Sequence, residues 1–222
     1  MIFKALYLSA LTLATLSCVN AAAAPKEIEL KIRISDAQHA ALEKWLSLHA
    51  TYDETGKQDD YYLRNPSEPW DTSKGFKDTL RTLRVRSAKK GGFVCYKYAH
   101  LDPVTKKITH RDEYETKVGD GLTMLEILGQ LGYTQRTLVS KTRTTYLVRN
   151  TFEIALDTVE SVGKFVEIEL KKQTNDVKAG IKAIEDLLRE IGITEFTEYE
   201  RSYIHMIWNP DYNFGKHRSL KP

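Results

Sequence analysis

Cysteine is almost absent from this sequence, which holds only Cys18 and Cys95. Cys18 lies in an N-terminal segment that we expect to be removed, so Cys95 is left without a partner. The sequence therefore offers neither a disulfide framework nor a cysteine zinc site. The six histidines form no pair at helical spacing, and the chain has no Walker sequence and no serine nucleophile elbow. These absences exclude several common kinds of metal centre and hydrolase.

An excess of charge of either sign is also missing. The 222 residues include 33 lysines and arginines and 30 aspartates and glutamates, which gives a formal net charge of +3. A nucleic-acid-binding protein would carry a stronger positive balance, so we predict no nucleic-acid partner. No proline- and glycine-rich linker divides the chain. We therefore predict one domain with a single core.

Long apolar stretches are absent except at the N-terminus. Lys4 is followed by the mostly apolar residues 5–19 and then by small residues up to Ala24, which is typical of a signal peptide with an Ala-x-Ala cleavage site. We expect residues 1–24 to direct export to the periplasm or out of the cell. An uncleaved membrane anchor and a lipoprotein are the alternatives. The run is short of the roughly 20 residues that a membrane span needs, and residues 15–18 match a lipobox poorly. Without this segment no membrane partner is expected.

The remaining chain divides into a domain and a tail. We place the domain at residues 25–208. Residues 209–222 are expected to form a flexible, solvated tail. Its basic side chains are Lys216, His217, Arg218 and Lys221.

The most informative feature is a repeated pentapeptide, Glu-Ile-Glu-Leu-Lys, at residues 27–31 and again at 167–171. Side chains alternate between two faces of an extended chain, so Glu27, Glu29 and Lys31 share one face while the apolar residues share the other. A row of carboxylates beside an ammonium group suits a divalent cation and the phosphates that it neutralises. The solvated face of an ordinary amphipathic strand is the alternative interpretation.

The same two-faced pattern recurs along the chain, which weakens that alternative. Nearly every predicted strand sets apolar side chains on one face and charged ones, of both signs overall, on the other. The further charged positions are Arg84 and Arg86; Lys97; Arg111, Glu113 and Glu115; Lys141 and Arg143; and Glu153 and Asp157.

Three segments have the periodicity of amphipathic helices, at residues 35–49, 120–131 and 175–191. The first begins with a capping box formed by Ser35 and Gln38. If these helices cover the apolar strand faces, the charged faces must point elsewhere. We therefore predict an α+β fold in which about eight strands form a closed antiparallel β-barrel, with the helices outside and a polar tunnel within. Such a tunnel is costly to fold unless it holds water, metal ions and an anionic ligand.

Taken in order, these charged residues resemble the signature of the CYTH superfamily, the triphosphate tunnel metalloenzymes. Glu27, Glu29 and Lys31 match its ExExK motif, and the arginine, lysine and acidic strands follow in family order up to Glu167 and Glu169. The resemblance covers residues 26–208. Three segments resemble the class IV adenylyl cyclase-like branch in particular, namely residues 58–63, 141–146 and 200–203.

This resemblance implies a triphosphate held by several cations, and carboxylates that bind Mg²⁺ or Mn²⁺. It implies catalytic roles for Lys31, Lys97 and Asp157. The implied phosphate-binding residues are Lys31, Arg84, Arg86, Lys97, Lys141 and Arg143. The implied metal ligands are Glu27, Glu29, Glu115, Asp157, Glu167 and Glu169.

Two reactions fit such a site, because its charges recognise a phosphate chain rather than a base. Attack by a metal-activated water would make the protein a triphosphatase for ATP, thiamine triphosphate or tripolyphosphate. Attack by the ribose 3′-hydroxyl of ATP would instead yield cyclic AMP and pyrophosphate. Export favours hydrolysis, since ATP is scarce outside the cytoplasm. A non-catalytic polyphosphate- or nucleotide-binding module is a third interpretation, against which the many carboxylates argue.

One further segment bears on access to the tunnel. Residues 65–77 include two prolines and a glycine and are expected to form a loop at the tunnel mouth that could gate access.

Overall fold

The computed structural model describes residues 28–88, 91–101, 103–104, 108–172 and 176–221. The expected signal segment lies outside these ranges. Within them the helices are α1 (Asp36–His49), α2 (Gly121–Gln130), α3 (Val177–Ile191) and α4 (Tyr203–Trp208). The strands are β1 (Ile28–Arg33), β2 (Thr51–Arg64), β3 (Arg81–Ala88), β4 (Gly91–Leu101), β5 (Ile108–Val118), β6 (Gln135–Val148), β7 (Phe152–Val159), β8 (Gly163–Leu170), β9 (Glu195–Tyr199) and β10 (Gly215–Ser219). None of these helices is long and apolar enough to cross a membrane.

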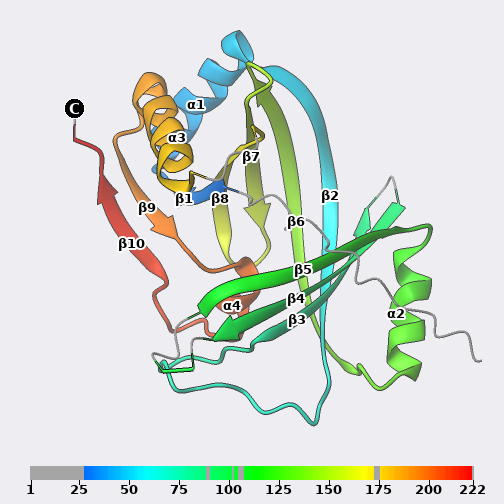
Figure 1. Cartoon of the computed structure of the whole chain (residues 1–222). Coiled ribbons are helices and arrows are strands. Elements are labelled where there is room, and N and C mark those ends of the chain that lie inside the picture. The colour runs from blue at the N-terminus through cyan, green and yellow to red at the C-terminus, as the bar shows by residue number, and fades with distance from the viewer. Residues whose placement is uncertain (1–27, 89–90, 102, 105–107, 173–175, 222) are drawn as a thin grey trace, which may run out of the picture.

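The described strands form one antiparallel sheet in the order β10-β9-β1-β8-β7-β6-β2-β3-β4-β5. Figure 1 shows that the long strands β2 and β6 curve, so that β3, β4 and β5 turn across the part of the sheet that holds β1, β7 and β8. The predicted α+β architecture, with an antiparallel sheet around a polar interior and helices outside, is confirmed. The sheet has more strands than predicted, and its edges are β10 and β5, with no pairing between described residues that closes it.

Helices α1 and α3 cover the outer face of the sheet around β1, β7 and β8 (Figure 1). Leu42 and Leu46 of α1 and Ile184 and Leu188 of α3 belong to the largest hydrophobic core. Their apolar partners on the sheet include Ile28, Leu30, Ile32, Ile154, Val166 and Ile168. Because these residues alternate with the charged ones along each strand, burying them directs the charged side chains to the concave side.

The predicted helices are confirmed with boundaries that agree within about one residue, except that residue 175, the predicted start of the third helix, lies outside the described residues. Ser35 begins α1 with the expected capping box, in which its side chain accepts from the Gln38 amide. Asp120 caps α2, and α3 ends at Gly192, whose φ of 88° lies in the left-handed region that glycine adopts readily.

Helices α2 and α4 occupy two further positions. In α2, Leu125 packs with Leu63 of β2 and Val85 of β3 on the outer face of the sheet. In contrast, α4 lies at one end of the concave side, where Ile204 belongs to the same apolar cluster as Phe165 of β8. Phe165 shares its strand face with Glu167 and Glu169, so α4 forms an end wall for the space that the sheet encloses.

The C-terminal residues correct the expectation of a flexible tail at 209–222. Gly215–Ser219 form β10, which pairs with β9. Arg218 forms ion pairs with Glu198 at 2.5 Å and with Glu185 at 2.6 Å, and Leu220 joins the largest core. The basic composition predicted a solvated tail because the acidic partners of Arg218 lie on a separate helix and strand. Only the fold brings these partners near the tail.

The loop of residues 65–80 connects β2 to β3 and is tied to the C-terminal end of α4. The Asn209 side chain accepts a hydrogen bond from the Lys77 amide at 2.6 Å and donates one to the Lys77 carbonyl at 3.0 Å. Phe76 packs against Tyr212 and Phe214, with ring centroids 4.9 and 5.0 Å apart. The predicted loop is confirmed, whereas its gating role stays a prediction.

Candidate active site

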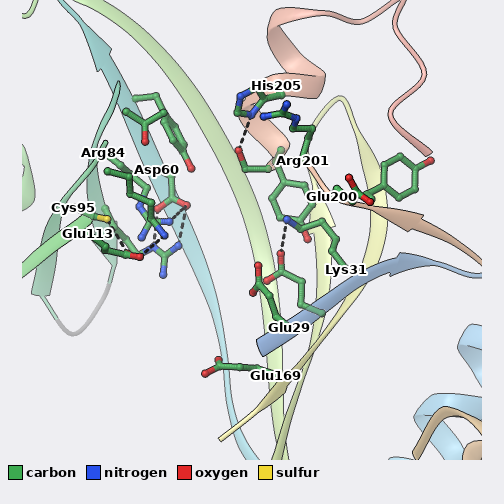
Figure 2. A pocket seen from close by; sticks show the side chains of 18 of the residues that line it. Glu29, Lys31, Asp60, Arg84, Cys95, Glu113, Glu169, Glu200, Arg201 and His205 are labelled. Atoms are coloured by element: carbon green, nitrogen blue, oxygen red, sulfur yellow. Dashed lines mark hydrogen bonds and ion pairs between the residues drawn. The ribbon is translucent and has the colours of Figure 1, made fainter. Parts of the chain in front are cut away.

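The concave side of the sheet encloses a cavity of about 730 Å³ that is lined mainly by charged side chains (Figure 2). Strands from both parts of the curved sheet contribute, so the charged faces do point inward. The acidic residues in the described lining are Glu29, Asp60, Asp78, Glu113, Glu115, Glu153, Glu167, Glu169, Glu198 and Glu200. The basic ones are Lys31, Arg84, Arg86, Lys97, Lys141, Arg143, Lys171 and Arg201.

Most of the predicted site residues meet in this cavity. Those that line it are Glu29, Lys31, Arg84, Arg86, Lys97, Glu115, Lys141, Arg143, Glu167 and Glu169. Glu27 lies outside the described residues. Asp157 is fully buried and lies behind the lining. The sequence thus predicts the location of the site, while the role of each residue in it stays a prediction.

The two copies of the repeated pentapeptide are neighbours in the sheet. Strands β1 and β8 pair antiparallel in a register that places Glu29 opposite Glu169 and Lys31 opposite Glu167. The middle residues of the two copies, Glu29 and Glu169, therefore lie opposite each other, and an opposed lysine and carboxylate lie next to them.

A row of carboxylates extends from this pairing. On β7, Glu153 lies opposite Glu169, so Glu29, Glu169 and Glu153 stand in line across three strands, and all three line the cavity. Like charges directly opposite each other destabilise a sheet. One lysine, Lys171, lies 3.5 Å from Glu153 and 3.1 Å from Glu169. Three carboxylates with one nearby ammonium group form an oxygen donor set that suits Mg²⁺ or Mn²⁺.

Replacing Glu169 by glutamine is expected to stabilise the metal-free protein, because the change removes one charge from a row of like charges. The free energy of unfolding should rise by a few tenths to about 1 kcal/mol. The same variant should lose part of the stabilisation that Mg²⁺ or Mn²⁺ gives to the wild type. Urea unfolding with and without metal measures both effects, with Glu43→Gln on the exposed face of α1 as the control. An unchanged response to metal would remove Glu169 from the ligand set.

Glu167 lies between two cations in the cavity wall. Lys31 Nζ is 3.1 Å from one carboxylate oxygen, and Arg143 donates to the other. Although burial acts to raise it, Lys31 and Arg143 hold the pKa of Glu167 well below its usual value. The Lys31 ammonium also lies 4.5 Å from the centre of the Tyr203 ring. Glu167 is therefore ionised at neutral pH and fixes two cations that face the cavity.

Asp157 has surroundings that differ from those of a metal ligand, although the sequence predicts it as one. Its carboxylate accepts hydrogen bonds from Lys141 at 3.2 Å, from Arg143 at 2.7 Å and from the Tyr203 hydroxyl at 2.8 Å. Burial and the neighbouring Arg143 lower the pKa of Lys141 to about 8. Burial, together with Glu167, raises the pKa of Tyr203 far above its usual value, so the hydroxyl remains a donor. These contacts favour a positioning role for Asp157, which holds two cations against the cavity.

A second charged group lies across the cavity on β2 and β3. Asp60 is 3% exposed and accepts two hydrogen bonds from Arg86, at 2.6 and 2.9 Å. Arg84 lies 3.9 Å from the same carboxylate. Although burial acts to raise it, the Arg86 guanidinium lowers the pKa of Asp60. Sequence reasoning did not assign Asp60 a role, yet strand alternation puts it on the same face as Tyr62, and both line the cavity.

The side chains of Cys95, Glu113 and Glu115 form another candidate cation site, with ligand atoms within 4.8 Å of one another. Burial raises the pKa of the Cys95 thiol to about 12, and the thiol donates to Glu113 at 3.2 Å. The sulfur is therefore protonated at neutral pH, and the carboxylates are the better ligands. Glu113 also pairs with Lys97 at 2.7 Å. Sequence reasoning placed Glu113 on this strand face without assigning it as a ligand.

The end wall adds residues to which the sequence assigned no role in the site, although Arg201 lies in the segment 200–203 that resembles the cyclase-like branch. Arg201 and His205 line the cavity, and both contact Asp78 of the loop between β2 and β3, at 3.5 and 3.1 Å. Figure 2 shows Arg201 and His205 side by side at the end of the cavity nearest α4. Only the fold brings the loop and α4 together, so strand periodicity carried no signal for this group.

Comparison with known proteins gives consistent matches. The family model of the CYTH domain matches residues 25–203. A Methanocaldococcus jannaschii protein named "Putative adenylate cyclase" is 27% identical over 183 residues, covering 81% of this chain and 97% of the relative. The structure of a Pyrococcus horikoshii protein is 28% identical with a TM-score of 0.61, covering 83% of this chain and 99% of that one. The structure of a Hippeastrum protein described as a "Putative adenylyl cyclase" with a dominant triphosphatase activity is 19% identical. The match covers 85% of this chain and 98% of that one, and the TM-score of 0.60 shows a shared fold.

Proposed function

The chain belongs to the CYTH domain family, and we propose that it is a divalent-metal-dependent enzyme that hydrolyses the triphosphate chain of a nucleotide or of an inorganic polyphosphate. The observation that carries this proposal is the charge of the cavity. Its described lining holds ten acidic and eight basic residues, so acids exceed bases by two. A protein that only bound an anion would gain nothing from so many carboxylates.

The charge balance also supports a metal requirement. A triphosphate brings roughly four further negative charges, which such a cavity could not hold without added cations. Bound Mg²⁺ or Mn²⁺ would supply that neutralisation and a more acidic water. The described residues whose ligand atoms converge are Glu113 and Glu115, beside Cys95. Glu29, Glu153 and Glu169 are a second group of carboxylates that line the cavity on neighbouring strands. Glu27 and Glu167 stay predicted members of the ligand set.

The basic side chains would hold the phosphate chain between the two walls of the cavity. Arg84 and Arg86 project from β3, while Lys31 and Arg143 project from β1 and β6 on the other wall. Asp60, Asp157 and Glu167 fix several of these cations through the contacts described above, so the charges are in place before a ligand arrives. Catalysis would then come mainly from positioning and from stabilising charge on the phosphate oxygens.

Hydrolysis is favoured over cyclisation because the cavity offers little surface to a base. The aromatic side chains in its described lining are Tyr62, Tyr199, Tyr203 and His205. Tyr62 and His205 pack against Trp208, while Tyr199 and Tyr203 pack against Phe165, so each belongs to the wall. A nucleoside base gains affinity by stacking on an open aromatic face. This lining therefore suits a phosphate chain better than a nucleoside.

Conversion of ATP to cyclic AMP and pyrophosphate is the second candidate function. The likeness to the archaeal relative named as an adenylate cyclase favours it. In that reaction the same charges would bind the triphosphate, and the ribose would have to lie where its 3′-hydroxyl reaches the α-phosphorus.

The test is to incubate the full chain with tripolyphosphate, thiamine triphosphate and ATP in turn, with Mg²⁺, with Mn²⁺ and with a chelator, and to identify the products. Metal-dependent release of phosphate would support hydrolysis, and the preferred compound would name the substrate. Cyclic AMP and pyrophosphate from ATP would establish the cyclase. Metal-dependent binding of tripolyphosphate without turnover would leave a binding module. An Arg84→Ala variant purified in the same way controls for contaminating phosphatases.

We also propose that residues 1–24 direct export of the enzyme, so that it acts in the periplasm or outside the cell. The apolar run before the Ala-x-Ala sequence supports this. N-terminal sequencing of the protein recovered from each cell fraction tests it. A mature chain beginning at or near Pro25 in the exported fraction is expected, and an intact N-terminus in the cytosol would contradict it.

A further inference from the structure

A chain of three hydrogen-bonding side chains lies in the end wall of the cavity. The Ser202 hydroxyl is 2.9 Å from His205 Nδ1, and His205 Nε2 is 3.1 Å from an oxygen of Asp78. All three residues line the cavity. His205 is 7% exposed and Asp78 3%, whereas Ser202 is only half-buried. Figure 2 shows His205 with its hydrogen bond drawn, beside Arg201. The half-buried serine is therefore the end of the chain that a water molecule in the cavity can reach.

The partners of His205 determine where a neutral imidazole carries its proton. An ionised carboxylate can only accept a hydrogen bond, so Nε2 carries the proton and donates to Asp78. The lone pair is then on Nδ1, where it accepts the proton of the Ser202 hydroxyl. The arrangement thus has the polarity of a hydroxyl activated by a histidine that a carboxylate orients.

Asp78 is held as an anion from several sides. Lys74 Nζ lies 2.8 Å away, Arg201 lies 3.5 Å away, and the Thr79 amide donates at 2.8 Å. Although burial acts to raise it, hydrogen bonds from His205 and Lys74 hold the pKa of Asp78 well below its usual value. The charged groups that face the histidine cluster are therefore Asp78, Lys74 and Arg201. A fixed anion at Nε2 would stabilise the imidazolium that forms when Nδ1 accepts a proton.

Ser202 differs from the other helix caps of this protein. Ser35, Asp120 and Asp176 each accept a hydrogen bond from an amide of the helix that they begin. Ser202 precedes α4 with backbone angles close to those of Ser35, but its side chain makes no cap hydrogen bond and contacts His205 instead. The serine therefore makes a hydrogen bond with the imidazole in place of the usual capping interaction.

We propose that Ser202, His205 and Asp78 form a proton relay that accepts the proton of the attacking water. This inference rests on the proposed hydrolysis. The water oxygen forms a bond to the terminal phosphorus, and the bond from that phosphorus to the bridging oxygen breaks, leaving its electron pair on the departing polyphosphate. The water proton passes to Ser202 Oγ as the serine proton passes to His205 Nδ1. The relay resets when the imidazolium releases its proton to the product or to solvent.

A relay of this kind fits the rest of the cavity. Apart from the exposed Glu200, the other carboxylates in the described lining hold lysines or arginines or belong to the candidate metal groups, and the guanidinium groups are permanently charged. Among the described lining residues, His205 supplies the single imidazole, the group suited to exchange protons near neutral pH. Asp78 acts through His205 and is a positioning residue.

The test compares Ser202→Ala and His205→Gln with the wild type in metal-dependent phosphate release from tripolyphosphate. Both variants should lower kcat about 10²-fold or more while KM and metal-dependent tripolyphosphate binding stay within a factor of about three. Ser47→Ala, which removes an exposed serine hydroxyl on α1, should behave as wild type. Because Ser202 makes no cap hydrogen bond, Ser202→Ala loses only the contact with His205 and should lower the melting temperature by no more than about 2–4 °C.

The pH profile separates a relay from a structural contact. The relay needs a neutral imidazole as its proton acceptor, so the wild-type kcat should fall as the pH is lowered. His205→Gln should lose that limb of the profile. Wild-type kcat in a folded Ser202→Ala variant, or an unchanged profile in His205→Gln, would overturn the relay and leave the proposed hydrolysis intact. Absence of phosphate release by the wild type itself would overturn both.

Discussion

Replacing Glu167 by alanine is expected to lower metal-dependent turnover of tripolyphosphate by about a thousandfold, which corresponds to about 4 kcal/mol of lost transition-state stabilisation. Glu167 holds Lys31 and Arg143 at the centre of the cavity wall, and it is also a predicted metal ligand. Its loss would release two cations that should contact the phosphate chain. The measurement is kcat and KM across a titration of Mg²⁺ or Mn²⁺.

Two further variants show which of these roles dominates. Glu167→Gln keeps the size of the side chain and an oxygen acceptor but removes the charge. If Glu167 binds metal, this variant should need more metal for half-maximal rate; if it serves mainly to hold Lys31 and Arg143, the KM for tripolyphosphate should rise instead. Lys97→Ala is the matched control, because Lys97 is 36% exposed and its removal should mainly raise KM. Full activity of Glu167→Ala would remove Glu167 from the site.

Replacing Asp157 by alanine is expected to destabilise the fold by about 3–5 kcal/mol, which is typical of breaking a buried ion pair by removing one partner. Asp157 is 0% exposed, and its loss leaves Lys141, which is 4% exposed, beside Arg143 without the anion between them. The Tyr203 hydroxyl also loses its acceptor. Urea unfolding of the metal-free protein measures the free energy directly.

Asp157→Asn separates charge from shape. The amide keeps one acceptor oxygen but introduces donors that face the Arg143 guanidinium, so this variant should lose nearly as much stability as Asp157→Ala. Tyr203→Phe removes the hydroxyl alone and should cost only about 1 kcal/mol. A loss below 1 kcal/mol in Asp157→Ala would mean that solvent or neighbouring carboxylates replace the missing charge, and the positioning role would then be withdrawn.

Strand periodicity carried most of what the sequence could predict. Because a side chain's face follows from its position in a strand, the alternation around Glu29, Lys31, Arg84 and Glu169 predicted which residues meet in the cavity. The amphipathic helices then required the apolar faces to be covered, which directed the charged faces inward. Helix caps such as Ser35 were predictable because their hydrogen bonds are local.

The features that the sequence did not reveal all depend on contacts across the fold. Glu153 extends the carboxylate row because the register of β7 against β8 places it opposite Glu169. The sequence of a single strand does not show its register with a neighbouring strand. Asp157 shares a strand face with Glu153, but the donors around it come from β6 and α4. The relay joins a loop to a short helix, and β10 is ordered by acids of β9 and α3.

The pairing of the two pentapeptide copies also has a consequence for how the protein folds. The copies begin 140 residues apart in the sequence, at residues 27 and 167, and β1 lies between β8 and β9 in the sheet. During folding, β1 can therefore pair with its neighbours only after β8 and β9 have formed. Closing such a long loop makes this pairing a late and slow event. Metal and substrate should thus have no effect on early refolding rates and should act only by retarding unfolding of the finished sheet.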